Sequence, residues 1–363
     1  MADYMKRSGK WQARIRWTDK SGKKHSRSKS GFPTKLLAKQ WVSDKESELF
    51  KGVKIDSNIT FPQYFEDWLK KYKQPKISPA SYERYSAVKK LVEASFSEEK
   101  LRDITRSEYQ DFINQYGKNR ALNSVRKVNN TIRQCVKSAI LDDLIIKDFT
   151  QNISLVANKS KTRKVEYLNI KEIKMLLKEA KRPAKGRLYT SRYMIITAIY
   201  TGMRLGEIQA LTWNDIDFLH QTITINKSWD HKNKCFKPTK NESSNRTIKI
   251  NNNLIKVFGE LKSKSQSNMV FMNEFNTIPT TTSVNTCLRE MLGQLKINKK
   301  NFHFHSLRHS QVALLLADGI DLYAISKRLG HSNITTTSEV YAYLIDEYKD
   351  RSDKLIIKAL DQL

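Results

Sequence analysis

Residues 305–309 read His-Ser-Leu-Arg-His, residues 329–331 read Leu-Gly-His, and Tyr341 follows ten residues later. His305 and Arg308 are three residues apart, so on a helix both side chains project from one face. A phenol among cations suits attack on a phosphodiester, because the cations stabilise the charge that develops around phosphorus. We interpret this stretch as the centre around which the rest of the chain is organised.

The chain is strongly basic throughout. Its 363 residues include 66 Lys and Arg against 37 Asp and Glu, a net charge of +29. Residues 1–55 alone carry 15 Lys and Arg against 5 Asp and Glu, so the charge does not reside in one tail. This balance predicts a polyanionic partner such as nucleic acid, and it makes a merely soluble basic protein the weaker alternative. The length predicts two or three domains.

Cysteine usage and hydropathy indicate the compartment. Cys135, Cys235 and Cys287 are far apart and show no metal-binding spacing, which suggests a reducing cytoplasm. The polar, charged start of the chain predicts no signal peptide. No run of about 18 apolar residues occurs, so we expect no membrane span.

The first part of the chain predicts a small sheet with one helix. Residues 8–32 alternate in places around a Gly-containing turn, which indicates a hairpin with a third short strand near residues 25–30. Thr34 is placed to cap a helix that follows. The density of Arg and Lys on these strands favours a DNA-binding unit, and a solvated basic β face is the alternative.

Residues 60–150 predict four helices. The first begins at Phe61 with apolar residues at helical spacing, Ser78 is an N-cap before a proline, and residues 105–108 form a capping box. The aromatic residues at this spacing favour a packed core over base-stacking platforms. Residues 151–166 are polar without periodicity and predict a hinge or linker.

From Tyr167 a second, mostly helical part begins. Two strand-like runs flank a polar, Lys-rich hairpin between residues 226 and 245. The fold class is therefore multidomain α+β: a small three-stranded sheet plus helix, a helical domain, and a mostly α domain with a small β-hairpin sheet. The strand runs are residues 222–225 and 246–250, and the helices are expected at about 170–180, 189–201, 204–211, 252–262, 282–295, 305–318, 321–329 and 335–345.

Residues 201–208, Thr-Gly-Met-Arg-Leu-Gly-Glu-Ile, form a further constellation. Gly202 predicts a turn that brings Arg204 to the N-terminal end of the next helix, where anions bind well. Glu207 is placed to orient or buffer a buried guanidinium, although a surface ion pair is the common alternative.

Residues 201–217, 305–309 and 329–341, in this order and at these intervals, closely resemble the tyrosine recombinases. The resemblance is nearest to integrases of temperate phages and integrative conjugative elements of Gram-positive bacteria, and it covers essentially the whole chain. It implies the following organisation: an arm-type-site DNA-binding domain at 1–55, a helical core-binding (SAM-like) domain at 60–150, the linker 151–166, and a catalytic domain at 167–363.

The resemblance also implies roles for site residues. Tyr341 would be the nucleophile that forms a 3′-phosphotyrosyl link and releases a 5′-hydroxyl. Arg204 and Arg308 would hold the non-bridging oxygens, because a planar guanidinium can donate two hydrogen bonds to a phosphate. His305 would take part in proton transfer from the tyrosine, and His331 would hydrogen-bond the phosphate.

A lysine on the hairpin would protonate the leaving 5′-oxygen, and Lys240 matches that position best. Glu207 takes the acidic supporting position of the family. Tyr343 competes with Tyr341 for the role of nucleophile, and the spacing from His331 favours Tyr341. The other hairpin lysines stay open as general acids: Lys227, Lys232, Lys234 and Lys237.

We expect no metal and no cofactor. The clustered carboxylates of a Mg²⁺ nuclease are missing from the sequence. His305 and His309 could ligate zinc at i and i+4, but neither the glutamate of a His-Glu-x-x-His motif nor a third ligand is evident. We interpret His309 as structural and His303 as lying outside the site.

The function that follows is a site-specific DNA recombinase that integrates and excises a mobile element. It would cut and rejoin double-stranded DNA without metal, through a Holliday junction and as a homotetramer in the bacterial cytoplasm, at the nucleoid. The resemblance further implies an excision factor and a host DNA-bending protein as partners. The alternative is a non-catalytic DNA-binding regulator that kept the fold. Residues 344–363 either dock on a neighbouring protomer or pack on their own domain.

Overall fold

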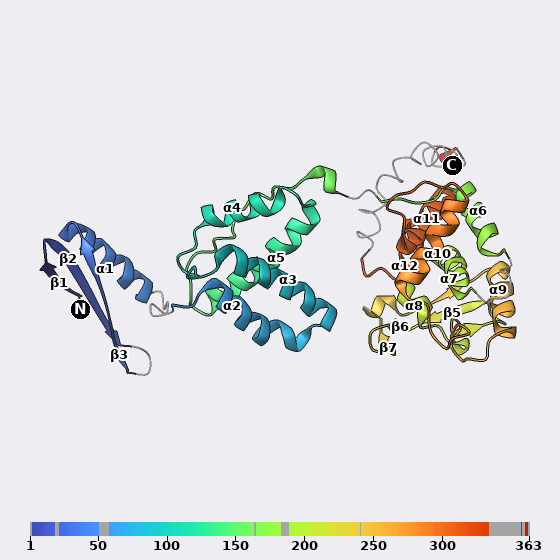
Figure 1. The fold of residues 1–363 in the computed structure, drawn as a ribbon, viewed down its shortest axis with the longest axis horizontal. Helices are drawn as coiled ribbons and strands as arrows, with labels where there is room; N and C mark the ends of the chain where they lie inside the picture. The colour runs from blue at the N-terminus through green and yellow to red at the C-terminus, as the bar shows by residue number, and fades with distance from the viewer. Residues whose placement is uncertain are drawn as a thin grey trace. The chain divides into compact units, whose positions relative to one another are not determined.

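The computed structural model describes residues 2–18, 22–50, 58–162, 165–182, 189–239, 241–333, 357, 360 and 361. The density of contacts divides the chain into two compact units, residues 1–163 and 164–363 (Figure 1). Across the described residues, no helix has both the length and the apolar character needed to cross a membrane.

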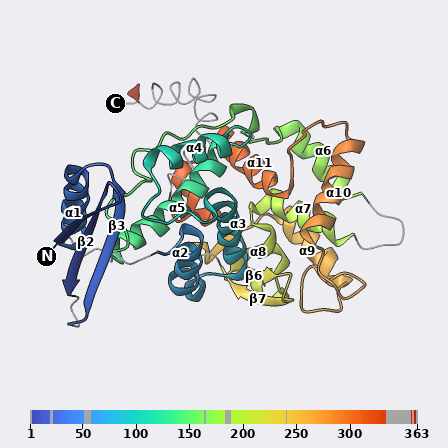
Figure 2. The ribbon, with the colours of Figure 1, turned by 60° about the vertical axis from the view of Figure 1, so that its left-hand side comes forward.

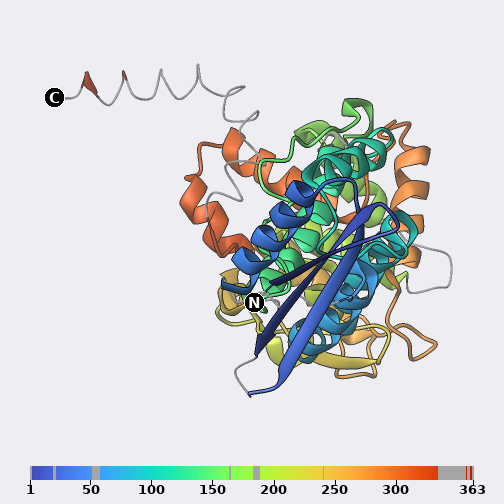
Figure 3. The same ribbon diagram turned by 90° about the vertical axis from the view of Figure 1, so that its left-hand side faces the viewer.

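An antiparallel three-stranded sheet with one helix forms the first part of the chain, as predicted. Its elements are β1 (Ala2–Arg7), β2 (Lys10–Thr18), β3 (Lys24–Phe32) and α1 (Lys35–Phe50). In Figure 3 this part, coloured blue, faces the viewer with α1 across the sheet. Its small core contains Ala13, Ile15, Ala38 and Val42.

The position predicted for the first strand was wrong. The sequence pattern placed all three strands within residues 8–32, whereas β1 spans Ala2–Arg7 and pairs with β2. The connecting turn is Ser8-Gly9, and both residues have positive φ, 46° and 78°. Such a two-residue turn matches the twist of a hairpin, and its chemistry was the overlooked signal.

Four α-helices make up the next part, which confirms the predicted number and the three predicted starts. They are α2 (Phe61–Trp68), α3 (Pro79–Phe96), α4 (Arg106–Gly117) and α5 (Leu122–Leu141). The Ser78 side chain accepts a hydrogen bond from the Ser81 amide, and Thr105 forms a capping box with Glu108. These caps satisfy amide groups that the first turn of a helix leaves without partners.

Aromatic side chains of this helical part form its core rather than an exposed platform. Phe61, Phe65 and Trp68 of α2 are almost fully buried. Tyr109 is also fully buried, and its hydroxyl donates to Asn129 Oδ1 at 2.9 Å. Residues 153, 155 and 157 pack against the same core, so the chain that leaves this part lies against it.

The unit from residue 164 is mostly helical, with two small sheets (Figure 1). The expected helix near residues 335–345 lies outside the described residues. One sheet has the order β4-β5-β8, and β6 pairs with β7 in a separate hairpin. The elements are α6 (Ile170–Ala180), α7 (Thr190–Thr201), α8 (Leu205–Gln209), β4 (Ile216–Asp217), β5 (Thr222–Ile225), β6 (Lys227–Asp230), β7 (Cys235–Pro238), β8 (Arg246–Lys249), α9 (Asn252–Ser263), α10 (Thr281–Gln294), α11 (Phe304–Ala317) and α12 (Leu322–Leu329).

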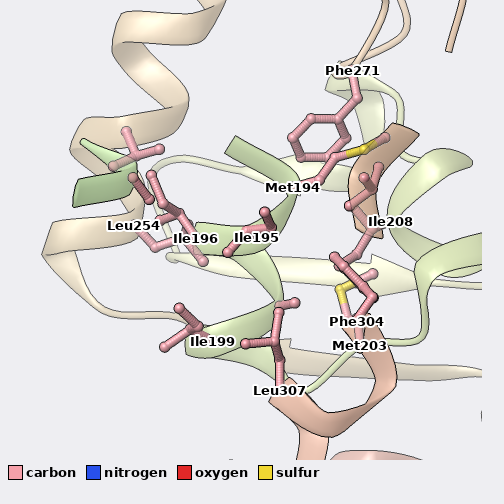
Figure 4. Packing of buried hydrophobic residues seen from close by; sticks show 14 of the residues in the cluster. Met194, Ile195, Ile196, Ile199, Met203, Ile208, Leu254, Phe271, Phe304 and Leu307 are labelled. Carbon is pink, nitrogen blue, oxygen red and sulfur yellow. The ribbon is translucent and has the colours of Figure 1, made fainter. Parts of the chain in front are cut away.

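Helix α7 is the centre of this unit. Nine of its residues are buried, and it contacts α6, α8, α9, α10 and α11. Figure 4 shows Met194 and Ile199 of α7 packed in one cluster with Leu254 of α9 and with Phe304 and Leu307 of α11. A helix that is apolar on most sides has to be surrounded by other elements. Helices α7 and α11 are therefore held in one packed core.

Gly117 tests the packing of the helical part. A Cβ at this position would lie 1.9 Å from the carbonyl oxygen of Val156, which is backbone and cannot rotate away. We expect Gly117→Ala to lower the free energy of unfolding by roughly 1–3 kcal/mol, measured by urea denaturation. The exposed Gln115→Ala on the same helix is the control and should stay within about 0.5 kcal/mol. Equal stability of the two variants would contradict this packing.

Candidate active site

Arg308 on α11 is almost completely buried, at 3% exposure. Its Nη1 donates to the carbonyl oxygen of Gly202 at 2.7 Å, and its Nη2 donates to that of Leu329 at 2.8 Å. Gly202 directly follows α7, and Leu329 is the last residue of α12. One guanidinium thus joins the C-terminal ends of two helices, where the partial negative charge of the helix favours a cation.

Both of these helix ends turn on a glycine. Gly202 has φ 64° and Gly330 has φ 71°, the left-handed conformation that side chains with a Cβ rarely adopt. The turn predicted at Gly202 is confirmed, and it places Arg204 at the N-cap of α8. The turn at Gly330 leads directly to His331. Arg308 therefore holds together the two turns that carry Arg204 and His331.

Glu207 is a buried carboxylate between two guanidinium groups. Its Oε1 lies 2.7 Å from Arg204 Nη1, and its Oε2 lies 2.9 Å from Arg246 Nη2. Burial raises the pKa of Glu207, but the charges and hydrogen bonds of Arg246 and Arg204 outweigh burial and hold the pKa below its usual value. Glu207 is therefore ionised at neutral pH and fixes the Arg204 side chain.

Arg246 is a site residue that the sequence pattern did not predict. Besides its bond to Glu207, Arg246 donates through Nε to the carbonyl oxygen of Arg328 at 2.7 Å and through Nη1 to that of Ser244 at 2.8 Å. A signal was present in the strand pattern. Arg246 stands two residues before Ile248, which is buried on the same strand, so the alternation of a strand directs this arginine inward.

Three histidines surround the arginines. His305 lies in the first turn of α11 and keeps part of its surface exposed, while its ring packs with a centroid 5.1 Å from that of His309. Desolvation and the charge of Arg308 lower the pKa values of His305 and His331 to about 4. Desolvation and the neighbouring His305 lower the pKa of His309 to about 4. All three imidazoles are therefore neutral at physiological pH.

The structure separates the hairpin lysines. Lys227 lies at the start of β6, and its Nζ is 2.6 Å from both carboxylate oxygens of the buried Asp215. Asp215 also accepts hydrogen bonds from the amide and hydroxyl of Thr212. This pairing anchors the base of the hairpin, which lies beside α8 (Figures 1 and 2). Lys227 thus has a structural partner, and Lys237 lies 3.8 Å from Asp230.

Part of the predicted site lies outside the described residues. Tyr341, Tyr343 and Lys240 belong to this group. Among the described residues, no group of three or more His, Cys, Asp or Glu side chains is arranged to hold a metal ion. The residues that the structure brings together are Arg204, Glu207, Arg246, His305, Arg308 and His331.

The three imidazoles predict a pH-dependent stability. In the unfolded chain they bind protons below about pH 6.5, whereas in the folded chain they bind protons only near pH 4. The unfolded state therefore binds more protons within this window, and stability falls as the pH is lowered through it. Urea midpoints measured between about pH 7 and about pH 5 should show this slope. His309→Gln should reduce the slope, and an unchanged slope would contradict the assignment.

Gly202 predicts a steric effect at the site. A Cβ there would lie 2.0 Å from Gln311 Oε1 and 2.7 Å from Leu329 Cδ2, in addition to the strain of a positive φ. We expect Gly202→Ala to lower the free energy of unfolding by roughly 1–3 kcal/mol. Gly259→Ala in α9 is the matched control, because its Cβ meets no atom within 4 Å and should stabilise by about 0.5–1 kcal/mol. Effects of the same sign in both variants would be inconsistent with this geometry.

Three family models match the chain. The model of the phage integrase family matches residues 166–347, about half of the chain. The model of the phage integrase N-terminal SAM-like domain matches residues 60–116, and the arm DNA-binding domain model matches residues 3–49. The three matches follow one another along the sequence.

Curated relatives extend over most of the chain. The integrase of Staphylococcus phage L54a is 26% identical over 354 residues, covering 88% of this chain and 98% of the relative. The ICEBs1 integrase of Bacillus subtilis is 25% identical and covers 74% of this chain and 75% of the relative. The tyrosine recombinase XerC of Pediococcus pentosaceus is 29% identical and covers 62% and 73%.

Solved structures share the fold. The Tn1549 transposon integrase in complex with transposon right end DNA has a TM-score of 0.71 at 16% identity, covering 82% of this chain and 100% of that one. A lambda integrase dimer bound to a COC′ core site has a TM-score of 0.59 at 17% identity, covering 93% of each chain. On the family match, the chain belongs to the phage integrase family, the tyrosine recombinases that carry out site-specific recombination of DNA.

Proposed function

We propose that this chain integrates and excises a mobile element by metal-free cleavage and rejoining of DNA strands. The observation that carries the proposal is the Arg308 clamp, which joins the turn before Arg204 to the turn before His331. Phosphate-binding side chains from two distant segments are thereby held near each other. A phosphodiester bound there would place its negative charge among these guanidinium groups.

In the proposed step, the phenol oxygen of Tyr341 attacks phosphorus and the bond from phosphorus to the 5′-oxygen breaks. A 3′-phosphotyrosyl link forms, the phenol proton passes to His305, and Lys240 protonates the leaving 5′-oxygen. Arg204, Arg308 and His331 would bind the non-bridging oxygens. Attack by a 5′-hydroxyl on the phosphotyrosyl link reverses the step, so the bond energy is kept and rejoining requires no metal or cofactor.

The low pKa of His305 suits this step once DNA is bound. A histidine with a pKa of about 4 is neutral at pH 7, so it can accept a proton, but it is a weak base. The negative charge of a bound phosphodiester favours the protonated imidazole and raises its pKa. DNA binding would therefore convert His305 into a better proton acceptor at the moment of cleavage.

We assign functions to the domains in line with the family matches. Residues 1–55 would bind arm-type sites, and residues 60–150 would bind core sites. Residues 151–166 would link the core-binding domain to the catalytic domain, residues 167–363. The arm DNA-binding and SAM-like matches support the first two assignments. Two modules with different specificity would allow one protomer to bridge an arm site and a core site.

We further propose a homotetramer on double-stranded DNA that passes through a Holliday junction. A lambda integrase tetramer bound to a Holliday junction shares the fold, with a TM-score of 0.58 at 17% identity over 92% of this chain and 96% of that one. An excision factor and a host DNA-bending protein would control direction, and the reaction would take place at the nucleoid in the bacterial cytoplasm.

A nicked DNA half-site from the junction of the element tests the chemistry. Incubated with the protein in EDTA, it should give a covalent adduct on a denaturing gel, which mass spectrometry would map to Tyr341. Tyr341→Phe should bind the half-site and form no adduct, because it lacks the attacking oxygen. Tyr343→Phe is the matched control and should still form the adduct.

Three other results are informative. An adduct at Tyr343 would keep the chemistry and move the nucleophile. An adduct that requires a divalent metal would contradict the metal-free step. Bound DNA without any adduct would favour the alternative, a non-catalytic regulator that kept the fold.

A further inference from the structure

Arg246 forms a second connection between the two turns that Arg308 joins. Its Nη2 donates to Glu207 Oε2 at 2.9 Å, and its Nε donates to the carbonyl oxygen of Arg328 at 2.7 Å. Glu207 belongs to α8, which follows the first turn, and Arg328 lies near the end of α12, just before the second. The Arg246 side chain is itself only 7% exposed.

Glu207 and Arg328, the two residues that Arg246 joins, lie next to groups that we propose bind the phosphate. Glu207 accepts hydrogen bonds from both the amide and the side chain of Arg204, at 3.0 and 2.7 Å. Arg328 is followed closely by His331. Arg246 and His331 also line one cavity of about 440 Å³, together with Gly330 and Lys327. A change in the position of Arg246 therefore reaches Arg204 through a carboxylate and His331 through the backbone.

The packing leaves little room for a side chain at Gly330. A Cβ on Gly330 would lie 2.9 Å from Arg246 Nη1 and 3.0 Å from the carbonyl oxygen of Ser243. Arg246 Nη1 also donates to the Ser244 carbonyl at 2.8 Å, and Ser244 is fully buried. The backbone of the second turn thus lies directly against the guanidinium.

We propose that Arg246 is a positioning residue that sets the orientation of Arg204 relative to His331. Arg308 binds the carbonyl oxygens of Gly202 and Leu329, and Arg328 Nη2 donates to that of Tyr200 at 3.2 Å, so these bonds join backbone at the two helix ends. Arg246 differs because it binds Glu207, the carboxylate that holds the Arg204 side chain. This inference rests on the proposed function, because it takes Arg204 and His331 as groups that bind the scissile phosphate.

The proposal predicts a specific kinetic defect. Misplacement of a binding group by about 1 Å can cost about 10²-fold in rate without loss of affinity for the rest of the substrate. We expect Arg246→Ala to slow single-turnover adduct formation on the half-site by about 10²-fold. Its affinity for the same DNA should change by less than about threefold, since the remaining DNA contacts persist.

A neutral scissile group separates positioning from loss of folded protein. A methylphosphonate lacks one anionic oxygen, so cations that stabilise charge there matter less. On a methylphosphonate half-site, Arg246→Ala and the wild type should react within about threefold of each other. Arg204→Ala should show the same pattern, because both variants would affect one interaction.

Two further variants complete the experiment. Arg246→Lys keeps a buried cation but cannot donate to Glu207 and Arg328 in the same geometry, so it should show a smaller defect of the same kind. If the alanine variant unfolds, the rates of Arg246→Lys on the two half-sites are used to test the proposal. Arg289→Ala on α10 is the matched control and should react like the wild type on both substrates, because Arg289 is an exposed residue that bonds within its own helix.

Different outcomes overturn different conclusions. Equal loss on both substrates would mean that Arg246 only supports the fold, and an unchanged rate on the phosphodiester would mean that it positions nothing. Either result overturns this inference alone, provided that the wild type forms its adduct. Absence of the adduct from the wild type would overturn the proposed chemistry and this inference together.

Discussion

The arrangement of the site depends on one buried guanidinium. Arg308 binds the carbonyl oxygens of Gly202 and Leu329, which end α7 and α12. Burying a charge in a protein interior costs several kcal/mol unless hydrogen bonds and opposite charge compensate it. Two helix C-termini provide that compensation through their partial negative charge. Gly202 and Gly330 adopt the positive φ that lets the chain change direction immediately after α7 and α12.

Three guanidinium groups and a carboxylate lie around this clamp. Arg204, Arg246 and Arg308 lie close together, and Glu207 is the carboxylate that pairs with two of them. Desolvation, together with the charges of Arg308 and Arg204, lowers the pKa values of His305 and His331, so both imidazoles are neutral. An anion that enters this region reduces repulsion and raises the basicity of the histidines. The electrostatics of this region thus favour a phosphate group and prepare the imidazoles for proton transfer.

Local signals were sufficient for much of the fold. The caps at Ser78 and Thr105 mark helix starts as predicted, because each satisfies amide groups within three residues. Signals that require pairing with distant residues were less complete. The first strand was missed although its partner lies across the short turn of Ser8 and Gly9, because the chemistry of that local turn was overlooked. The ion pair of Lys227 with Asp215 joins β6 to a different segment, and spacing along the chain does not reveal it.

By itself, the sequence determined the fold class, the helix starts and the residue types of the candidate site, because periodicity, capping and motif spacing are local properties of the chain. Only the tertiary structure decided that Arg204 and His331 lie near each other. Their proximity depends on carbonyl oxygens, which every residue possesses and no motif records. For the same reason Arg246 became visible as part of the site only when β8 was placed against α8 and α12. Packing decides which carbonyl oxygens accept hydrogen bonds from a buried guanidinium.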